Sequence, residues 1–225
     1  AQRDALPEDI AIQFPWVDRL FEAMNITMIR KPGFEADDII GTLSVEAEAA
    51  GFETFMVTPD KDYTQLVSDH VTMFKPGRQG GSPEMLGVQE VLEKWQIERV
   101  DQVVDILGLM GDASDNIPGV PGIGPKTAQK LIAKFGSMES LLENTDQLKG
   151  KQKERIEENK DQAILSKELV TICLDVPHDV VLDDLKWSGF DKAKLKELFG
   201  ELEFDTLGKR MLGKSFSAAP ARQAA

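Results

Sequence analysis

The stretch Phe55-Met56-Val57-Thr58-Pro59-Asp60-Lys61-Asp62 sets a short apolar run directly before two carboxylates. Three consecutive apolar residues followed by the turn-forming Thr-Pro-Asp predict a buried strand that ends near Val57. In open α/β sheets, ligands bind in the crevice beyond the carboxyl ends of the strands. Asp60 and Asp62 therefore stand where such a fold builds a site, although an ordinary surface turn uses the same residue types.

The segments around this strand favour an α/β fold with a mostly parallel sheet flanked by helices. We expect a helix from about Glu35 to Ala50, closed by Gly51, then the strand, a short helix over Tyr63–Val67 and a strand over Val71–Phe74. The remaining expectations for this class are one or two helices over Pro7–Met24 with a break at Pro15, a strand over Thr27–Ile29, and a strand over Val176–Leu182 at the sheet edge.

From Pro83 onward the apolar spacing becomes helical, which predicts a second, all-helical region. Helices are expected near Lys126–Lys134, Lys151–Val170 and Lys192–Phe199, and Ser215–Ala225 has the composition of a linker. The predicted domains are residues 1–84 for the α/β core, 85–175 for the helical region, 176–214 for a C-terminal strand and helices, and 215–225 for the linker.

Composition bounds the function. The 225 residues contain one cysteine, Cys173, so neither an internal disulfide framework nor a Cys/His zinc site is expected, and a reducing cytoplasm is the simplest setting. No apolar run approaches a membrane span, and no signal peptide is visible, so we expect a soluble protein. The net charge of −13 argues against nucleic-acid binding, unless bound cations neutralise part of the acidic surface.

Two further acidic clusters accompany Asp60 and Asp62. Glu35-Ala36-Asp37-Asp38 begins a predicted helix, where ordinary capping explains acids equally well. Asp112-Ala113-Ser114-Asp115 follows an apolar helix, and acids at a helix C-terminus are electrostatically unfavourable unless a cation relieves them. Neither Asp60 nor Asp112 starts a calcium-loop pattern. Carboxylates in three clusters predict Mg²⁺ or Mn²⁺, and with them two-metal phosphodiester hydrolysis.

A glycine-rich segment, Asn116-Ile117-Pro118-Gly119-Val120-Pro121-Gly122-Ile123-Gly124-Pro125-Lys126-Thr127, joins two predicted helices. Its glycines permit a close approach of the backbone to a ligand, and the helix start presents unpaired N–H groups. Lys126, Lys130 and Lys134 add positive charge along the following helix. A plain interhelical turn is the alternative, but the string favours DNA-phosphate binding without sequence preference.

These four motifs, in this order and spacing, resemble the 5′ nuclease (5′-3′ exonuclease) domain of bacterial DNA polymerase I, within the flap endonuclease superfamily. The resemblance runs from residue 1 to about residue 212. It implies a PIN-like α/β domain with a helix-three-turn-helix DNA-binding region. The implied activity is removal of 5′ nucleotides and flaps, including RNA primers on DNA, in Okazaki fragment processing and excision repair.

The resemblance also implies roles for individual residues and for partners. Two or more Mg²⁺ or Mn²⁺ ions would be held by Glu35, Asp37 and Asp38 in one region and by Asp60, Asp62, Asp112 and Asp115 in another. Duplex DNA with 5′ ends, flaps or nicks would contact Gly119, Val120, Gly122, Ile123, Gly124, Lys126, Thr127 and Lys130, with Arg3 at the edge of a helical arch. A potassium ion could sit on main-chain oxygens near Val120 and Ile123. Polymerase domains in the same chain, a monomeric state and a nucleoid location complete the expectation.

One departure from the family pattern limits these expectations. The family begins with a strand that bears an Asp, followed by a second Asp and an arch of basic and aromatic residues, and this sequence matches none of it. The chain is therefore expected to be N-terminally truncated. The alternative function is a catalytically incomplete, sequence-independent DNA-binding module, which metal-independent binding without cleavage would reveal. A PIN-like ribonuclease and a helix-hairpin-helix glycosylase fit less well, since the first generally lacks the glycine hairpin and the second needs no acidic clusters.

Overall fold

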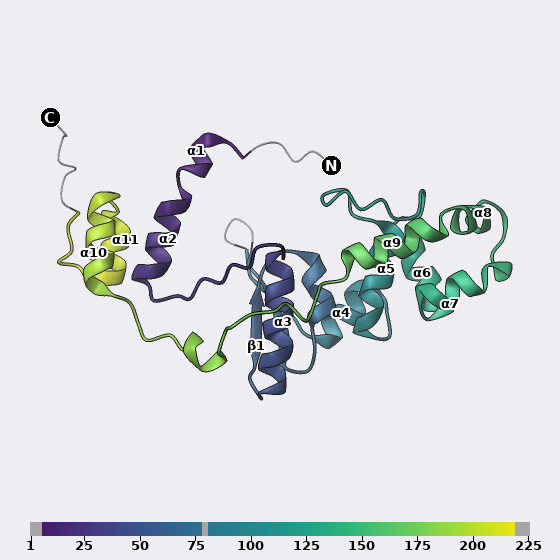
Figure 1. Cartoon of the computed structure of the whole chain (residues 1–225), viewed down its shortest axis with the longest axis horizontal. Helices are drawn as coiled ribbons and strands as arrows, with labels where there is room; N and C mark the ends of the chain where they lie inside the picture. The colour runs from purple at the N-terminus through teal and green to yellow at the C-terminus, as the bar shows by residue number, and fades with distance from the viewer. Residues whose placement is uncertain (1–5, 78–80, 219–225) are drawn as a thin grey trace. The chain divides into compact units, whose positions relative to one another are not determined.

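The computed structural model describes residues 6–77 and 81–218, and its contacts divide the chain into two compact units (Figure 1). The first unit is Lys31–Pro177, and the second joins residues 6–30 to residues 178–218. This division differs from the predicted one. The predicted boundary after residue 84 falls inside the first unit, and residues 6–30 pack with the C-terminal segment instead of the α/β core.

A small mixed sheet forms one end of the first unit. Its order is β1 (Thr54–Val57), β2 (Val71–Lys75) and β3 (Glu84–Leu86). β1 and β2 are parallel, whereas β3 pairs antiparallel to β2. The predicted strands at Phe55–Val57 and Val71–Phe74 are confirmed, but β3 was not predicted. On β1, Phe55 and Val57 are 56% and 66% exposed, so the sheet carries an uncovered apolar strip.

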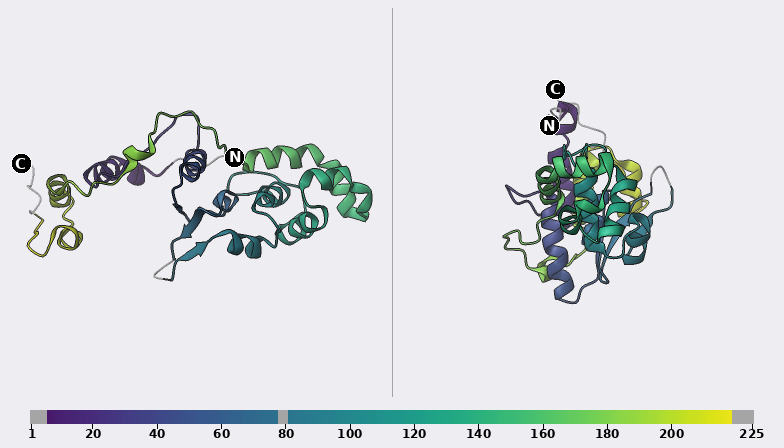
Figure 2. Two further views of the ribbon diagram at one scale, coloured as in Figure 1. Left: turned by 90° about the horizontal axis from the view of Figure 1, so that it is seen from below. Right: turned by 90° about the vertical axis from the view of Figure 1, so that its right-hand side faces the viewer.

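Two helical segments flank β1 in the sequence. The predicted helix after Glu35 is α3 (Ala36–Ala49), which packs on β1 and is seen end-on in the left view of Figure 2. Gly51, two residues beyond α3, has a φ of +82°, a left-handed conformation that suits glycine at a helix end. The turn after β1 leads into η1 (Lys61–Leu66), a 3-10 helix where a short helix was expected.

Two predicted strands are wrong. Residues 27–29 form no strand; Ile26, Thr27 and Ile29 instead line an apolar groove in the second unit. Residues 176–182 form no strand either. The N–H of Val176 donates to the Thr42 hydroxyl and the N–H of Val180 donates to His178 Nδ1, each at 3.1 Å, and the segment ends in a 3-10 turn, η5 (Leu182–Leu185). Side-chain contacts take the place of sheet pairing in both segments.

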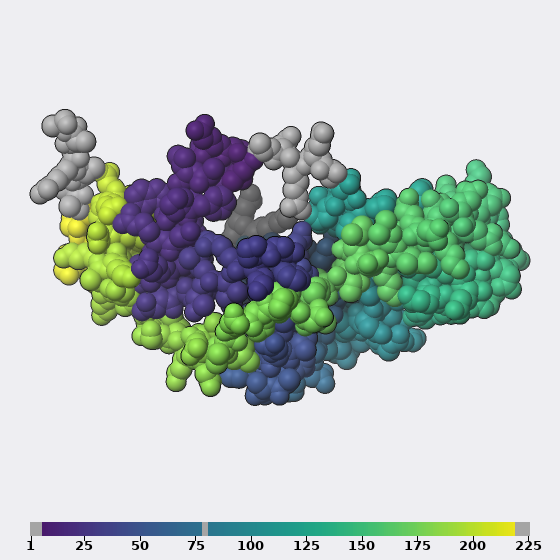
Figure 3. Space-filling model, in the orientation of Figure 1, coloured from purple at the N-terminus to yellow at the C-terminus, as the bar shows by residue number. Residues whose placement is uncertain are grey.

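The rest of the first unit is helical. The sheet leads into α4 (Val88–Trp95), η3 (Val100–Gln102) and α5 (Val103–Met110), and the glycine segment leads into α6 (Pro125–Phe135) and α7 (Met138–Glu143). After η4 (Thr145–Gln147), the predicted helix over residues 151–170 is two helices, α8 (Gly150–Glu158) and α9 (Lys160–Val170), with Asn159 between them. Figure 3 shows parts of the green α8–α9 segment at the surface of this unit.

One continuous hydrophobic core joins the sheet to the helices. It contains Met73 from β2, Trp95 from α4 and Leu107 from α5, all buried. The indole N–H of Trp95 donates to the Thr64 hydroxyl at 2.9 Å, which satisfies a polar group inside this core. The acid-bearing segment after β1 and the helices therefore belong to one packed body.

The second unit is a small helical cluster. α2 (Phe14–Ala23) packs on α10 (Lys192–Glu201), and α10 packs on α11 (Asp205–Leu212). The short, exposed α1 (Glu8–Ala11) precedes α2, and Pro15 stands in the first turn of α2. Ala23, Phe199 and Phe216 meet in its core. Phe216 is 7% exposed, so the predicted linker does not begin at Ser215, and residues 219–225 lie outside the described residues.

Candidate metal centre and nucleic-acid interface

Three of the predicted metal ligands meet in one cluster. Asp62 lies in η1, whereas Asp112 and Asp115 lie in the loop after α5. Each offers a carboxylate oxygen, and the three oxygens lie within 4.8 Å of one another. Folding thus joins two sequence motifs about fifty residues apart, as their positions at the ends of elements predicted.

Asp112 is held firmly by the backbone around it. Its N–H and C=O exchange hydrogen bonds with Ile117 at 2.9 and 2.7 Å, and its Oδ1 accepts from the N–H of Ser114 at 2.8 Å. Burial raises the pKa of Asp112, but the hydrogen bonds from Lys61 and from Ser114 outweigh it, so that the pKa lies below its ordinary value. Asp112 is therefore a preorganised anion.

Lys61 supplies positive charge inside the cluster. Its ammonium contacts Asp112 Oδ2 and lies 3.4 Å from Asp62 Oδ1. Asp62 Oδ1 is nonetheless a buried atom without a hydrogen bond, because that ionic contact lacks hydrogen-bond geometry. Burial raises the pKa of Asp62, and Lys61 compensates only in part. A buried carboxylate oxygen without a donor, beside two further carboxylates, fits a hard divalent cation.

The other carboxylates of these motifs lie around the cluster. Burial, together with the charges of Asp60 and Asp38, raises the pKa of Asp37, which accepts a hydrogen bond from the Tyr63 hydroxyl at 2.9 Å. The charge of Asp60 also raises the pKa of Asp62. The charge of Asp60 therefore acts on both Asp37 and Asp62 and links the two acidic regions electrostatically.

Glu35 and Asp38 stabilise the start of α3. The N–H of Glu35 donates to Asp38 Oδ2 at 3.0 Å, which begins α3. The N–H of Cys173 donates to Asp38 Oδ1 at 2.9 Å and ties a distant segment to the same helix start. Both oxygens of Asp38 are thus engaged by backbone N–H groups, and the contact with Glu35 is the one that the capping interpretation of this motif expected.

The glycine hairpin is fixed by close backbone packing. Gly111 and Gly119 have φ angles of +71° and +58°, and a Cβ on either one would overlap the backbone of the opposite strand of the loop. The N–H of Val120 donates to Leu109 O at 2.8 Å. Because Gly111 directly precedes Asp112, this packing joins the hairpin to the acidic loop.

Helix α9 holds the hairpin from the other side. The N–H of Gly119 donates to the Ser166 hydroxyl at 3.1 Å, and the Gln162 amide donates to Gly119 O. Ser166 is fully buried. Both backbone polar groups of one loop residue are therefore satisfied by one helix, which leaves the hairpin little freedom to rearrange.

The predicted DNA-contacting side chains differ in exposure. Lys126 and Lys130 are exposed on α6, and Thr127 is half-buried. Val120 and Ile123 are buried, at 2% and 4% exposure, so their side chains do not contact a ligand at the surface. Gly122 and Gly124 are exposed, whereas Gly119 is buried, and Arg3 lies outside the described residues.

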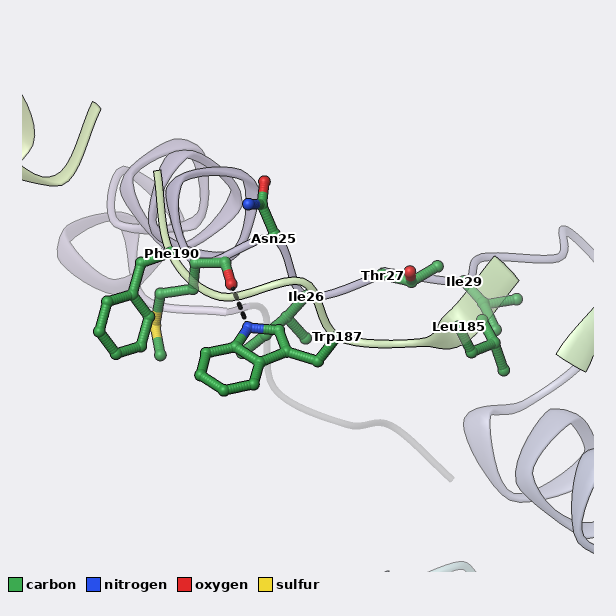
Figure 4. Close-up of a pocket in the computed structure, with 8 residues that line it drawn as sticks. Asn25, Ile26, Thr27, Ile29, Leu185, Trp187 and Phe190 are labelled. Atoms are coloured by element: carbon green, nitrogen blue, oxygen red, sulfur yellow. Dashed lines mark hydrogen bonds between the residues drawn. The ribbon is translucent and has the colours of Figure 1, made fainter. Parts of the chain in front are cut away.

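An apolar groove of about 490 Å³ lies in the second unit (Figure 4). Trp187 crosses it and donates its indole N–H to Met24 O at 2.8 Å. Its lining within the described part of the chain contains no carboxylate, so it offers none of the predicted chemistry. Across residues 6–77 and 81–218, no helix is both long and apolar enough to cross a membrane.

Sequence reasoning missed three groups that shape the sites. Lys61 lies between two predicted ligands in the sequence, and its positive charge could have identified it as part of the site. Tyr63 and Ser166 had no local signal, since each acts on a residue far away in the sequence, Asp37 and Gly119 respectively.

Two family models match the chain in succession. The 5′-3′ exonuclease N-terminal resolvase-like domain matches residues 1–96, and the 5′-3′ exonuclease C-terminal SAM fold matches residues 98–193. The chain belongs to the 5′-3′ exonuclease family. The family fold, a resolvase-like α/β part followed by a helical part, agrees with the predicted α/β fold and its helical region.

Curated relatives support this membership. The chain is 43% identical over 210 residues to DNA polymerase I of Bacillus subtilis (strain 168), a match that covers 93% of this chain and 24% of the relative. It is 37% identical over 211 residues to DNA polymerase I of Mycobacterium tuberculosis (strain ATCC 25618 / H37Rv), covering 94% of this chain and 23% of the relative. The chain thus spans about a quarter of the length of these relatives.

Solved structures share the fold. A T5 5′-exonuclease with bound zinc aligns with a TM-score of 0.61 at 24% identity, over 88% of this chain and 72% of that one. The catalytic core of Rad2 in complex with a DNA substrate aligns with a TM-score of 0.59 at 16% identity, over 93% and 67%. At these identities the likeness concerns the fold alone.

Proposed function

We propose that the chain is a metal-dependent 5′ nuclease, acting as a 5′-3′ exonuclease and structure-specific 5′ flap endonuclease. The observation that carries the proposal is the cluster of Asp62, Asp112 and Asp115, with a buried carboxylate oxygen that lacks a donor. Family membership supports the reaction class, and the DNA-bound and metal-bound relatives of the same fold support the substrate and cofactor.

The proposed cofactor is Mg²⁺ or Mn²⁺, with two or more ions. When bound, such ions supply an activated water and positive charge at the scissile phosphate. Asp62, Asp112 and Asp115, with Asp60, would hold one ion; Glu35, Asp37 and Asp38 are proposed for the other region. Asp112 suits this task because its lowered pKa keeps it ionised and its backbone is fixed.

The hairpin is proposed to hold duplex DNA by its phosphates. Its backbone is fixed by α9, and Lys126 and Lys130 present exposed ammonium groups on the adjacent helix. Phosphate contacts carry no sequence information, so binding should depend on DNA structure and salt. A potassium ion on main-chain oxygens near Val120 and Ile123 belongs to the same proposal.

The wider setting is inferred from the curated relatives. We place the chain beside polymerase domains in one longer protein, with DNA flaps, nicks and RNA primers on DNA as substrates, in primer removal and excision repair. A monomer in the bacterial cytoplasm, at the nucleoid, is the expected state. The single cysteine accords with this setting.

The test is cleavage of an end-labelled 5′-flap duplex by the chain in Mg²⁺, in EDTA, and by an Asp112→Asn variant. Cleavage in Mg²⁺ that is lost in EDTA and in the variant supports the proposal. Asp101→Asn is the matched control, since Asp101 is an exposed acid outside the cluster that pairs with Arg99. Binding of the duplex without cleavage under every condition would instead support the catalytically incomplete DNA-binding module.

A further inference from the structure

A basic side chain from a helix outside the predicted interface lies against the hairpin. Arg155 of α8 donates from Nη1 to Gly122 O at 3.3 Å. A Cβ on Gly122 would overlap this guanidinium, so the glycine is what lets Arg155 approach the loop so closely. In the sequence, α6 follows the hairpin directly. α8 comes about thirty residues further along and contacts the hairpin through Arg155.

The basic residues of α8 do not all share one face. Side chains four residues apart on a helix differ in direction by about 40°, so Lys151 and Arg155 lie on the same face. Lys153 is about 200° from each of them. It is also engaged, since its ammonium lies 3.7 Å from Glu157 on the next turn. Lys151 and Arg155 therefore form a basic ridge, which we call the α8 ridge, with Arg155 at the hairpin.

The charges of this ridge are available to a ligand. Lys151 and Arg155 are exposed, and neither forms an ion pair within residues 6–77 and 81–218. The guanidinium has five N–H donors, and Gly122 O is its only hydrogen-bond acceptor in the described chain. In a chain of net charge −13, one such cation against the exposed Gly122 and a second on the same face of α8 favour a polyanion at that place.

We propose that the α8 ridge, Lys151 and Arg155, is a second phosphate-binding element for the same duplex DNA that the hairpin holds. The inference rests on the proposed DNA binding by the hairpin and extends it. Arg155 suits the role because a planar guanidinium binds a phosphate through two parallel hydrogen bonds while the chain beneath it stays fixed. The duplex would then be held by cations from α6, which follows the hairpin, and from α8, which contacts the hairpin at Gly122.

A purely structural role of Arg155 makes a different prediction. If Arg155 only positioned Gly122, its loss would weaken DNA binding without changing the number of phosphates neutralised. The dependence of affinity on salt reports that number, since each phosphate contact contributes a slope of about −0.9 in log K against log salt. The salt slope therefore separates phosphate contact from positioning.

The experiment measures fluorescence anisotropy of a labelled 5′-flap duplex in EDTA, which prevents metal-dependent cleavage, while KCl rises from about 50 to about 200 mM. We expect Arg155→Gln to reduce the slope by about 0.9 and to weaken binding about eightfold at about 0.1 M salt. Arg155→Lys, which keeps the charge, should retain most of the slope. The double variant Lys151→Gln, Arg155→Gln should lose about 1.8 in slope.

Lys153→Gln is the matched control on the opposite face of α8 and should keep both slope and affinity. Circular dichroism and urea denaturation of each variant check the fold. An Arg155→Gln variant with the slope of the unmodified chain overturns the proposal, whatever its affinity. If the unmodified chain itself fails to bind the duplex, the proposed DNA binding fails too, which distinguishes the two failures.

Discussion

The acidic cluster and the glycine hairpin are held in place by different kinds of contact. The hairpin is positioned by its main chain: the N–H and C=O of Gly119 are both satisfied by α9. The cluster is positioned by side chains, and the charges of Asp62 and Asp112 are only partly balanced by Lys61. One region is complete without a ligand, whereas the other retains a buried oxygen without a donor.

This difference indicates how the two regions would respond to perturbation. A change in the hairpin should act on the free energy of unfolding first, because the loop is part of the packing between α5 and α9. A change in the cluster should act on cation affinity first, because its side chains are not fully satisfied within the protein. Three substitutions sharpen this comparison.

The largest effect is expected for Gly119→Ala. Gly119 has a φ of +58°, and its Cβ would overlap the backbone of Gly111, which cannot yield as a side chain could. Left-handed strain together with overpacking should lower the free energy of unfolding by about 4 kcal/mol in urea denaturation. Gly124→Ala is the control, since no atom lies within 4 Å of its Cβ, and it should cost less than about 1 kcal/mol. Equal midpoints for both variants would show that the hairpin is not tightly packed.

A somewhat smaller effect is expected for Lys167→Met, which breaks the ionic link between α5 and α9. The Lys167 ammonium lies 2.5 Å from the Asp105 carboxylate, whose side chain is 5% exposed, and 2.7 Å from Glu139. The buried Asp105 Oδ1 has no hydrogen bond of good geometry with the Lys167 ammonium. This ammonium is nonetheless the only cation near Asp105 in the described chain. Leaving Asp105 unpaired should cost about 3 kcal/mol at neutral pH.

The penalty of Lys167→Met should depend on pH. Burial already raises the pKa of Asp105, and losing Lys167 raises it further. A carboxyl whose pKa is raised in the folded state favours folding when protonated, so this stability is lost as pH rises through the raised pKa. The penalty should therefore shrink as pH falls toward 4, measured by urea denaturation. Lys153→Met, which removes an exposed helix pair, should cost about 0.5 kcal/mol or less with little pH dependence.

The smallest effect is expected for Lys61→Met. It concerns cation binding, which this substitution should strengthen. Lys61 places its ammonium against Asp112 and Asp62, so it competes with any cation for these carboxylates. Its side chain is 37% exposed, and solvent screening reduces the interaction. Removing the ammonium should strengthen Mn²⁺ binding roughly tenfold in calorimetry without DNA. Weaker binding in the variant would mean that Lys61 supports the site instead of competing for it.

Local pattern predicted the elements whose reasons are local. α3, β1, β2 and α10 follow from apolar spacing and from the glycine and proline positions around them. Thr27–Ile29 is as apolar as a strand, but these residues meet Trp187 in the second unit, a contact that no local rule supplies. The break at Asn159 was missed because residues 151–170 contain neither glycine nor proline to mark it.

The site was predictable to a similar extent. The positions of Asp62, Asp112 and Asp115 at the ends of predicted elements indicated that they lie near one another, as they do. The glycine-rich sequence identified the hairpin. The engagement of Asp38 by the N–H of Cys173 could not be foreseen, because it depends on a contact over 135 positions in the sequence. Arg155 was missed for the same reason, since its partner Gly122 lies 33 positions away.

The most direct test of the central claim, that Asp62, Asp112 and Asp115 form a divalent-cation site, is Mn²⁺ binding followed by electron paramagnetic resonance without DNA. The unmodified chain should bind Mn²⁺, and Asp62→Asn and Asp112→Asn should each weaken binding by at least about tenfold, while Asp101→Asn should not. Mn²⁺ binding that is absent, or that is unchanged in both cluster variants, would contradict the claim.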